Sequence, residues 1–152
     1  MALTARELAE RFAPDELLVV GVGNPIRGDD AAGMQLARKL SERYGYELLE
    51  CEDVPEKWLR EMRTSQAGTV LFVDAAQMSQ APGTIRLLEI SQLGDITVST
   101  HNNSLRVVGE FLMKMADKEV LFLGIQPVDI GTGRPMTEIV EKAIERFFED
   151  AP

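Results

Sequence analysis

The sequence is poor in the residues that build disulfides and closed metal sites. Its 152 residues include one cysteine, Cys51, and one histidine, His101. A lone cysteine excludes an internal disulfide, so the fold has to be stabilised by its hydrophobic core. A chain of this length can do so, because it buries about two thirds of its unfolded surface as a single domain, here spanning 1–152. With so few Cys and His ligands, a closed structural zinc site is not expected.

Basic residues are also in the minority. The chain has 16 Lys and Arg against 25 Asp and Glu, a formal net charge of −9. Nucleic acids and anionic membranes are bound through basic residues that displace counterions, so neither is an expected partner. No stretch resembles a signal peptide or a membrane span, and residues 4–12 are instead typical of a short amphipathic helix. Together these absences predict a cytoplasmic protein.

Apolar residues alternate between strand-like and helical spacing along the chain. Strands are expected at 17–23, 46–50, 69–75, 81–90 and 119–127, and helices at 4–12, 30–44, 55–62, about 103–115 and 137–148. This alternation predicts an α/β fold, a mostly parallel, twisted five-stranded sheet with helices on both faces. Ligands bind such sheets outside the carboxyl ends of the strands. The candidate positions are therefore Gly21–Asp30, Asp74 and Gln126–Asp129.

The stretch GVGNPIRGDDAAG at 21–33 lacks the features of a phosphate-binding loop, although it follows a strand. Ile26 occupies the third glycine position of the dinucleotide fingerprint, and Pro25 removes a backbone N–H that pyrophosphate would need. The G-x-x-x-x-G spacing from Gly23 to Gly28 fits a P-loop, but Asp29 and Asp30 occupy the positions of its Lys and its Ser or Thr. Two carboxylates repel a triphosphate, so nucleotide binding would require an intervening divalent ion.

These two aspartates have structural interpretations as well as functional ones. Asp29 is expected to cap the following helix, and Asp30 fits an acidic residue at the positive end of that helix. One cap needs one carboxylate, so Asp30 is the better candidate to face the crevice. Gly21 and Gly23 are expected to allow close packing of the strand against the helix.

Asp74 and His101 are the other ligand-type side chains at predicted crevice positions. Asp74 ends the apolar run TVLFVDA, where a carboxylate needs a cation or a hydrogen-bonding role in the next turn. His101 precedes a helix, and its alternative role is a turn residue satisfied by the backbone. Asp30, Asp74 and His101, completed by water, would suit a borderline divalent ion such as nickel or zinc. Cys51 is expected to be a small buried residue.

At this point several stretches together resemble the motifs of the hydrogenase maturation endopeptidases. In order they are GVGNPIRGDDAAG, LFVDAAQM, the THN of 100–102 and VLFLGIQP, with PGTIRLL and the PMT of 135–137 as further matches. The resemblance covers about residues 17–147 and is strongest to members that process formate-hydrogenlyase (hydrogenase-3) type nickel-iron hydrogenases. It implies a three-layer sandwich of the phosphorylase/hydrolase-like kind.

The resemblance implies an endopeptidase, conventionally grouped with the aspartic type, that removes a short C-terminal extension from the hydrogenase large-subunit precursor. Nickel is carried by that precursor, and zinc or cadmium would substitute in crystals. The family's metal-contacting residues correspond to Asp30, Asp74 and His101, and Asp30 and Asp74 are also the catalytic candidates. We expect a monomer whose partner is the precursor. A non-catalytic, nickel-sensing chaperone of the precursor is the alternative function.

One stretch departs from the family pattern. Relatives usually have an acidic residue and two glycines after the second strand, whereas this chain reads ECEDVPEKW. A loop of different shape is expected there. The helix at 4–12 precedes the usual start of the family and is expected only to pack against the core.

Overall fold

A computed structural model of the chain describes residues 3–94 and 101–149. The strands are β1 (Leu17–Val22), β2 (Glu47–Glu52), β3 (Thr69–Ala75), β4 (Ile85–Glu89) and β5 (Glu119–Ile125). The α-helices are α1 (Ala5–Arg11), α2 (Ala32–Tyr44), α3 (Leu59–Thr64), α4 (Asn102–Met115) and α5 (Glu138–Phe147). Three 3₁₀ turns complete the described elements: η1 (Gly28–Ala31), η2 (Pro55–Trp58) and η3 (Ile90–Gln92).

The strands form one sheet in the order β2-β1-β3-β5-β4. The pairs β1–β2, β1–β3 and β3–β5 are parallel, and only β4 runs antiparallel, beside β5. The predicted five-stranded, mostly parallel sheet is therefore confirmed. Because β1 pairs with β2 on one side and with β3 on the other, the chain changes direction across the sheet between β1 and β3. This switch point is where open α/β sheets form their ligand crevice.

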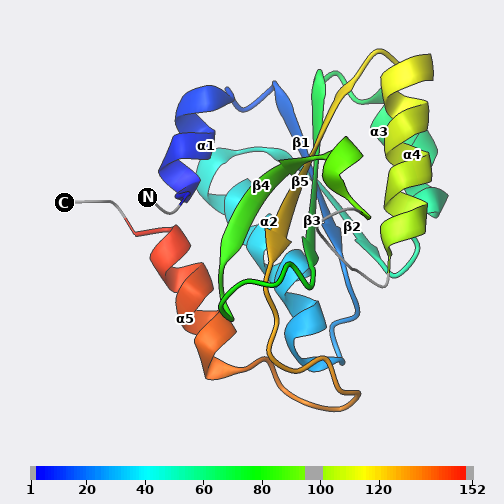
Figure 1. Ribbon diagram of the computed structural model, residues 1–152. Coiled ribbons are helices and arrows are strands. Elements are labelled where there is room, and N and C mark those ends of the chain that lie inside the picture. Colours follow the sequence, from blue (N-terminus) through cyan, green and yellow to red (C-terminus); the bar gives the residue numbers. More distant parts are fainter. Residues whose placement is uncertain (1–2, 95–100, 150–152) are drawn as a thin grey trace.

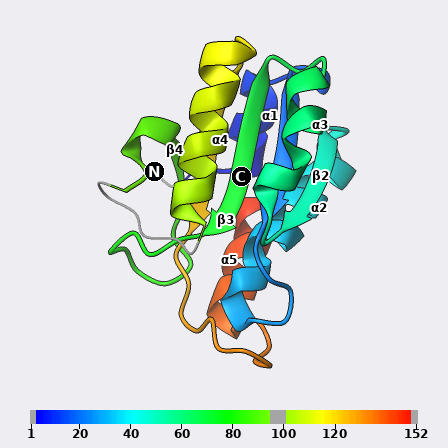
Figure 2. The same ribbon diagram turned by 90° about the vertical axis from the view of Figure 1, so that its right-hand side faces the viewer.

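Helices cover both faces of the sheet, as Figures 1 and 2 show. One hydrophobic core joins α1, α2 and α5 to alternate residues of the central strands, such as Val19 and Leu71. The other joins α3 and α4 to the intervening residues, such as Val20 and Phe72. The central strands are buried along both faces, which explains their continuous apolar sequence. The three-layer arrangement is confirmed.

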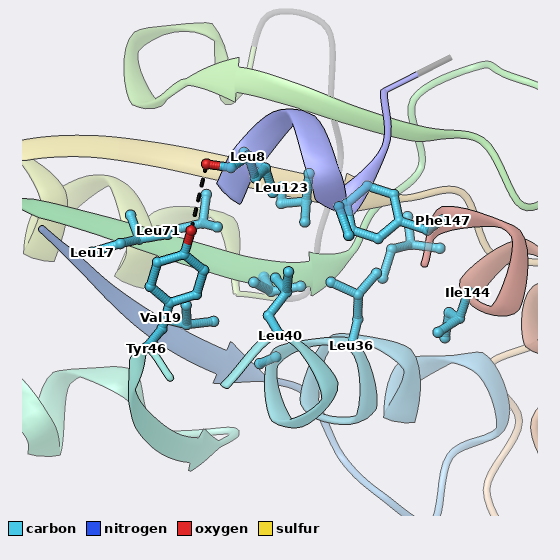
Figure 3. Close-up of a cluster of buried hydrophobic side chains, with 14 of the residues drawn as sticks. Leu8, Leu17, Val19, Leu36, Leu40, Tyr46, Leu71, Leu123, Ile144 and Phe147 are labelled. Carbon is cyan, nitrogen blue, oxygen red and sulfur yellow. Dashed lines mark hydrogen bonds between the residues drawn. The ribbon is translucent and has the colours of Figure 1, made fainter. Parts of the chain in front are cut away.

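The N-terminal helix α1 is held to the first core by both apolar and polar contacts (Figure 3). Leu8 and Phe12 are buried, and the hydroxyl of Tyr46 donates to the carbonyl oxygens of Phe12 at 2.8 Å and Leu8 at 3.5 Å. The Thr4 side chain caps the helix by accepting the N–H of Glu7 at 3.3 Å. The helix expected at 4–12 thus lies where it was predicted and packs against the core.

Several predicted boundaries differ from the structure. The expected helix at 30–44 begins at Ala32, because η1 occupies the preceding residues. The expected helix at 55–62 is the 3₁₀ turn η2 followed by the short helix α3. None of the helices in the described part of the chain has the length and apolar composition that crossing a bilayer requires.

Candidate functional site

The backbone N–H groups of the loop after β1 donate hydrogen bonds to other groups of the protein. The N–H of Asn24 donates to Asp30 Oδ2 at 2.9 Å, and that of Ile26 donates to Asn24 Oδ1 at 3.0 Å. Gly28 and Asp29 donate to carbonyl oxygens of the segment after β5, at 2.9 and 2.7 Å. A phosphate-binding loop needs such groups pointing at the ligand. With these donors already bonded, and Pro25 having none, the loop has no anion cradle, which agrees with the interpretation that it is not a phosphate-binding loop.

Asp29 does not cap the helix that follows it, α2, so that expectation was wrong. Helix α2 has Ala31 as its N-cap and no side-chain cap bond. The buried Asp29 carboxylate instead accepts the backbone N–H groups of Val128, Asp129 and Thr137 at 2.8, 3.1 and 2.7 Å, and the Thr137 hydroxyl at 2.9 and 3.0 Å. Asp29 therefore ties the loop between β1 and α2, which we call the glycine loop, to the segment between β5 and α5.

Two glycines let the backbone come close enough to form the crevice. Gly23 has φ +135°, and a Cβ there would lie 2.0 Å from the backbone oxygen of Asp30. Gly33, in the first turn of α2, would place a Cβ 2.4 Å from the carbonyl oxygens of Val22 and Val73. The start of α2 therefore packs directly on the ends of β1 and β3, and this places Asp30 beside Asp74. Gly21, as expected, contacts α2, where its Cβ would lie 3.1 Å from Ala37.

The structure brings Asp30, Asp74 and His101 together at the switch point. One ligand atom from each residue lies within 4.8 Å of the other two, although the three come from η1, the end of β3 and the residue before α4. Their exposed fractions are 2%, 0% and 7%. Buried carboxylates beside an imidazole need a positive charge among them. Two carboxylates and one imidazole make a donor set that fits a divalent ion.

His101 supplies that charge when no ion is bound. Its Nδ1 lies 3.0 Å from Asp74 Oδ2 and its Nε2 lies 2.9 Å from Asp53 Oδ1. Burial by itself would lower the pKa of His101. The hydrogen bonds to Asp74 and Asp53, with the negative charges of Asp74 and Asp30, outweigh burial and raise the pKa from 6.5 to about 9. The imidazolium therefore persists at neutral pH, and a metal ion bound through His101 would have to displace one of its protons.

Among the residues that the structure describes, Asp53 lies at the site but was missed by the sequence analysis. It follows β2, whose carboxyl end lies beside that of β1, so strand order would have pointed to it. The β1–β2 register shifts between Gly21 and Val22, so that Glu50 and Glu52 are paired while Cys51 is skipped. Glu52 then takes φ +50°, a left-handed conformation that glycine adopts more easily. The loop expected to differ in shape thus contains a β-bulge.

Other candidates at this edge of the sheet have structural roles. Cys51 is buried, as expected, and burial followed by the charges of Glu61 and Glu56 raises the pKa of its thiol to about 12. The Gln126 side chain accepts the N–H groups of Met78 and Gln80. Asp129 Oδ1 accepts the N–H of Gly131 at 2.8 Å.

The fold and the site define an α/β protein with a buried group of two carboxylates and one imidazole at its switch point, which could hold a metal ion. A family profile described as HycI, hydrogenase maturation protease, matches residues 32–151, which include Asp74 and His101. The hydrogenase 3 maturation protease of Escherichia coli K12 is 33% identical over 131 residues, covering 84% of this chain and 83% of that protein. This chain belongs to the hydrogenase maturation protease family and is an endopeptidase of that family.

Solved structures of the family share the fold. The [NiFe] hydrogenase maturation protease HycI from Thermococcus kodakarensis KOD1 superposes with a TM-score of 0.75 at 28% identity, covering 87% of this chain and 86% of that one. The solution structure of the endopeptidase HycI from Escherichia coli gives 0.69 at 29% identity, with 85% and 84% covered.

Proposed function

We propose that this protease removes a short C-terminal extension from the large-subunit precursor of a nickel-iron hydrogenase after nickel has been inserted. The observation that carries the proposal is the group formed by Asp30, Asp74 and His101, whose ligand atoms all lie within 4.8 Å of one another. Three protein donors leave positions in a metal shell for donors from a second molecule. Such a group suits an ion that arrives already held by the precursor.

The precursor we propose is of the formate-hydrogenlyase, hydrogenase-3 type. The support is sequence similarity, since the relative from Escherichia coli K12 that acts on hydrogenase 3 is 33% identical over 84% of this chain. The ECEDVPEKW loop lies beside the proposed site and differs from the usual family pattern. It is therefore the first place to examine for a difference in precursor choice.

In this proposal the three residues bind the nickel of the precursor and so position the nearby peptide bond. Nickel bound there would act as a Lewis acid toward the scissile carbonyl or a water. Asp30 and Asp74 are the candidates for the general base that takes the proton of the attacking water. Asp74 is hydrogen-bonded to His101 through Oδ2, and Asp30 accepts the backbone N–H of Asn24 through Oδ2. These bonds hold both carboxylates in place.

The proposal is tested by incubating the purified protein with nickel-loaded precursor and measuring the precursor mass by mass spectrometry. We expect a shortened precursor with the wild-type protein, none with His101→Ala or Asp30→Asn, and none with nickel-free precursor. Asp15→Asn is the matched control, because Asp15 is exposed and lies before β1, at the other end of that strand. An unshortened precursor in stable complex would indicate the chaperone alternative. Normal cleavage by both site variants would refute the proposed site.

A further inference from the structure

We propose that Asp53 is a positioning residue that holds His101 by Nε2, so that Nδ1 is the nitrogen presented to the nickel of the precursor. The inference rests on the proposed function of the site. Its basis is the Asp53 Oδ1 to His101 Nε2 distance of 2.9 Å. Asp53 itself lies outside the group of three ligands.

The two ring nitrogens of His101 face different surroundings. Nδ1 faces Asp74, a member of the ligand group, at 3.0 Å. Nε2 faces Asp53, whose side chain is 46% exposed, at the outer side of the group. A ring nitrogen that donates its proton to a carboxylate cannot bind a metal, and the other nitrogen then carries the free lone pair. The contact to Asp53 therefore selects Nδ1 as the ligand and fixes the plane of the ring.

A strained backbone at the end of β2 places Asp53 beside His101. The β-bulge at Cys51 and the left-handed Glu52 (φ +50°) turn the chain at the end of β2. The carbonyl oxygen of Glu52 accepts the N–H of Gly23 at 2.9 Å, so this turn is tied to the glycine loop. The N–H of Val54 then donates to the carbonyl oxygen of Cys51 at 3.1 Å, which closes the turn around Asp53. Bulges next to active sites commonly re-aim a side chain in this way.

The chain has one histidine, so its imidazole nitrogen signals belong to His101 without further assignment. We would titrate ¹⁵N-labelled protein with ¹¹³Cd²⁺ and measure the affinity and the ¹¹³Cd–¹⁵N coupling by NMR. Wild-type protein should couple through Nδ1, with Nε2 still protonated. Cys51 does not compete for cadmium, because it is buried as a thiol.

Asp53→Ala should weaken cadmium binding about 10- to 100-fold, the usual loss when the outer partner of a ligating histidine is removed. Asp53→Asn should lose less cadmium affinity than Asp53→Ala, because its amide oxygen can still accept a hydrogen bond from the Nε2–H of His101. Glu56→Gln is the matched control: it removes an exposed carboxylate from the same loop and should bind as the wild type does. The thermal unfolding of each variant checks that the fold is intact. Cleavage of nickel-loaded precursor by Asp53→Ala should show a raised KM that Asp53→Asn partly restores.

Two results would overturn the inference alone. One is coupling of cadmium to Nε2 in the wild-type protein, and the other is equal cadmium affinity in Asp53→Ala and wild type. Failure of the wild-type protein to bind cadmium or nickel at all would instead overturn the proposed metal role of Asp30, Asp74 and His101, and the role of Asp53 with it.

Discussion

The two adjacent aspartates of the glycine loop should give different defects when they are replaced: Asp29→Ala should lose stability, and Asp30→Ala should lose precursor cleavage. Asp29→Ala removes the acceptor of three backbone N–H groups and one hydroxyl. A polar group left without its partner costs about 1–3 kcal/mol, and the part-buried groups here regain some bonds to water. We therefore expect a loss of about 3–5 kcal/mol, a large share of the 5–15 kcal/mol typical of a domain.

Asp30→Ala should change stability much less, because Asp30 accepts one backbone N–H and lies close to a second carboxylate, Asp74. We expect a change within about 1 kcal/mol, since relief of the repulsion from Asp74 offsets both the lost hydrogen bond and the lost attraction to the His101 imidazolium. Precursor cleavage should nevertheless disappear in this variant. Asp29→Ala should keep measurable cleavage at a temperature where it remains folded.

Urea unfolding followed by circular dichroism measures both effects. For a chain of this size the expected loss in Asp29→Ala corresponds to a midpoint shift of roughly 2 M urea. The matched control is Asp15→Asn, which should unfold as the wild type does. Wild-type stability in Asp29→Ala, or an equal loss in Asp30→Ala, would show that the division of roles between the two aspartates is wrong.

Three further predictions concern the other strained or titrating groups. Glu52→Gly should raise the free energy of unfolding by about 1 kcal/mol, because glycine adopts φ +50° without steric cost, and a destabilised variant would contradict this. In the metal-free protein, the stabilising contribution of His101 should be fully present below about pH 6.5 and should be lost as the pH rises through its folded pKa of about 9. Melting temperatures measured across this range should show that loss in the wild type but not in His101→Ala, and a loss in both would refute the assignment. Cys51 should react with a thiol reagent only upon unfolding, since it is buried and the pKa of its thiol is about 12; fast reaction of the native protein would disprove its burial.

The sequence was sufficient for the features that depend on local periodicity and strand order. The five strands and the helices between them follow from apolar spacing, and the rule for carboxyl ends of parallel strands isolated Asp30 and Asp74. The antiparallel direction of β4 could not be predicted, because edge strands of either direction have similar patterns. The resemblance to the family added the large-subunit precursor and the expectation that it carries nickel, which no spacing in the chain indicates.

The roles of Asp29 and Asp53 needed coordinates for a different reason. The partners of Asp29 are backbone N–H groups 99 to 108 residues further along the chain, and every residue except proline has such a group. Strand order could place Asp53 at the carboxyl end of β2 but could not give the direction of its side chain, because one residue is skipped at the β2 bulge and a shift of one residue reverses that direction. The departure of this loop from the family pattern was visible in the sequence, but its consequence for His101 was not.

The different roles of Asp29 and Asp30 follow from the 3₁₀ turn that contains both residues. In a helix with three residues per turn, neighbouring side chains point about 120° apart, so both aspartates cannot face the same partner. Asp29 faces the segment between β5 and α5, and Asp30 faces β3. Neither caps α2, because that helix begins at Ala32, where the N–H already donates to the carbonyl oxygen of Asp29. With Asp29 occupied in closing the loop, Asp30 is the carboxylate left to meet Asp74 and His101 at the switch point.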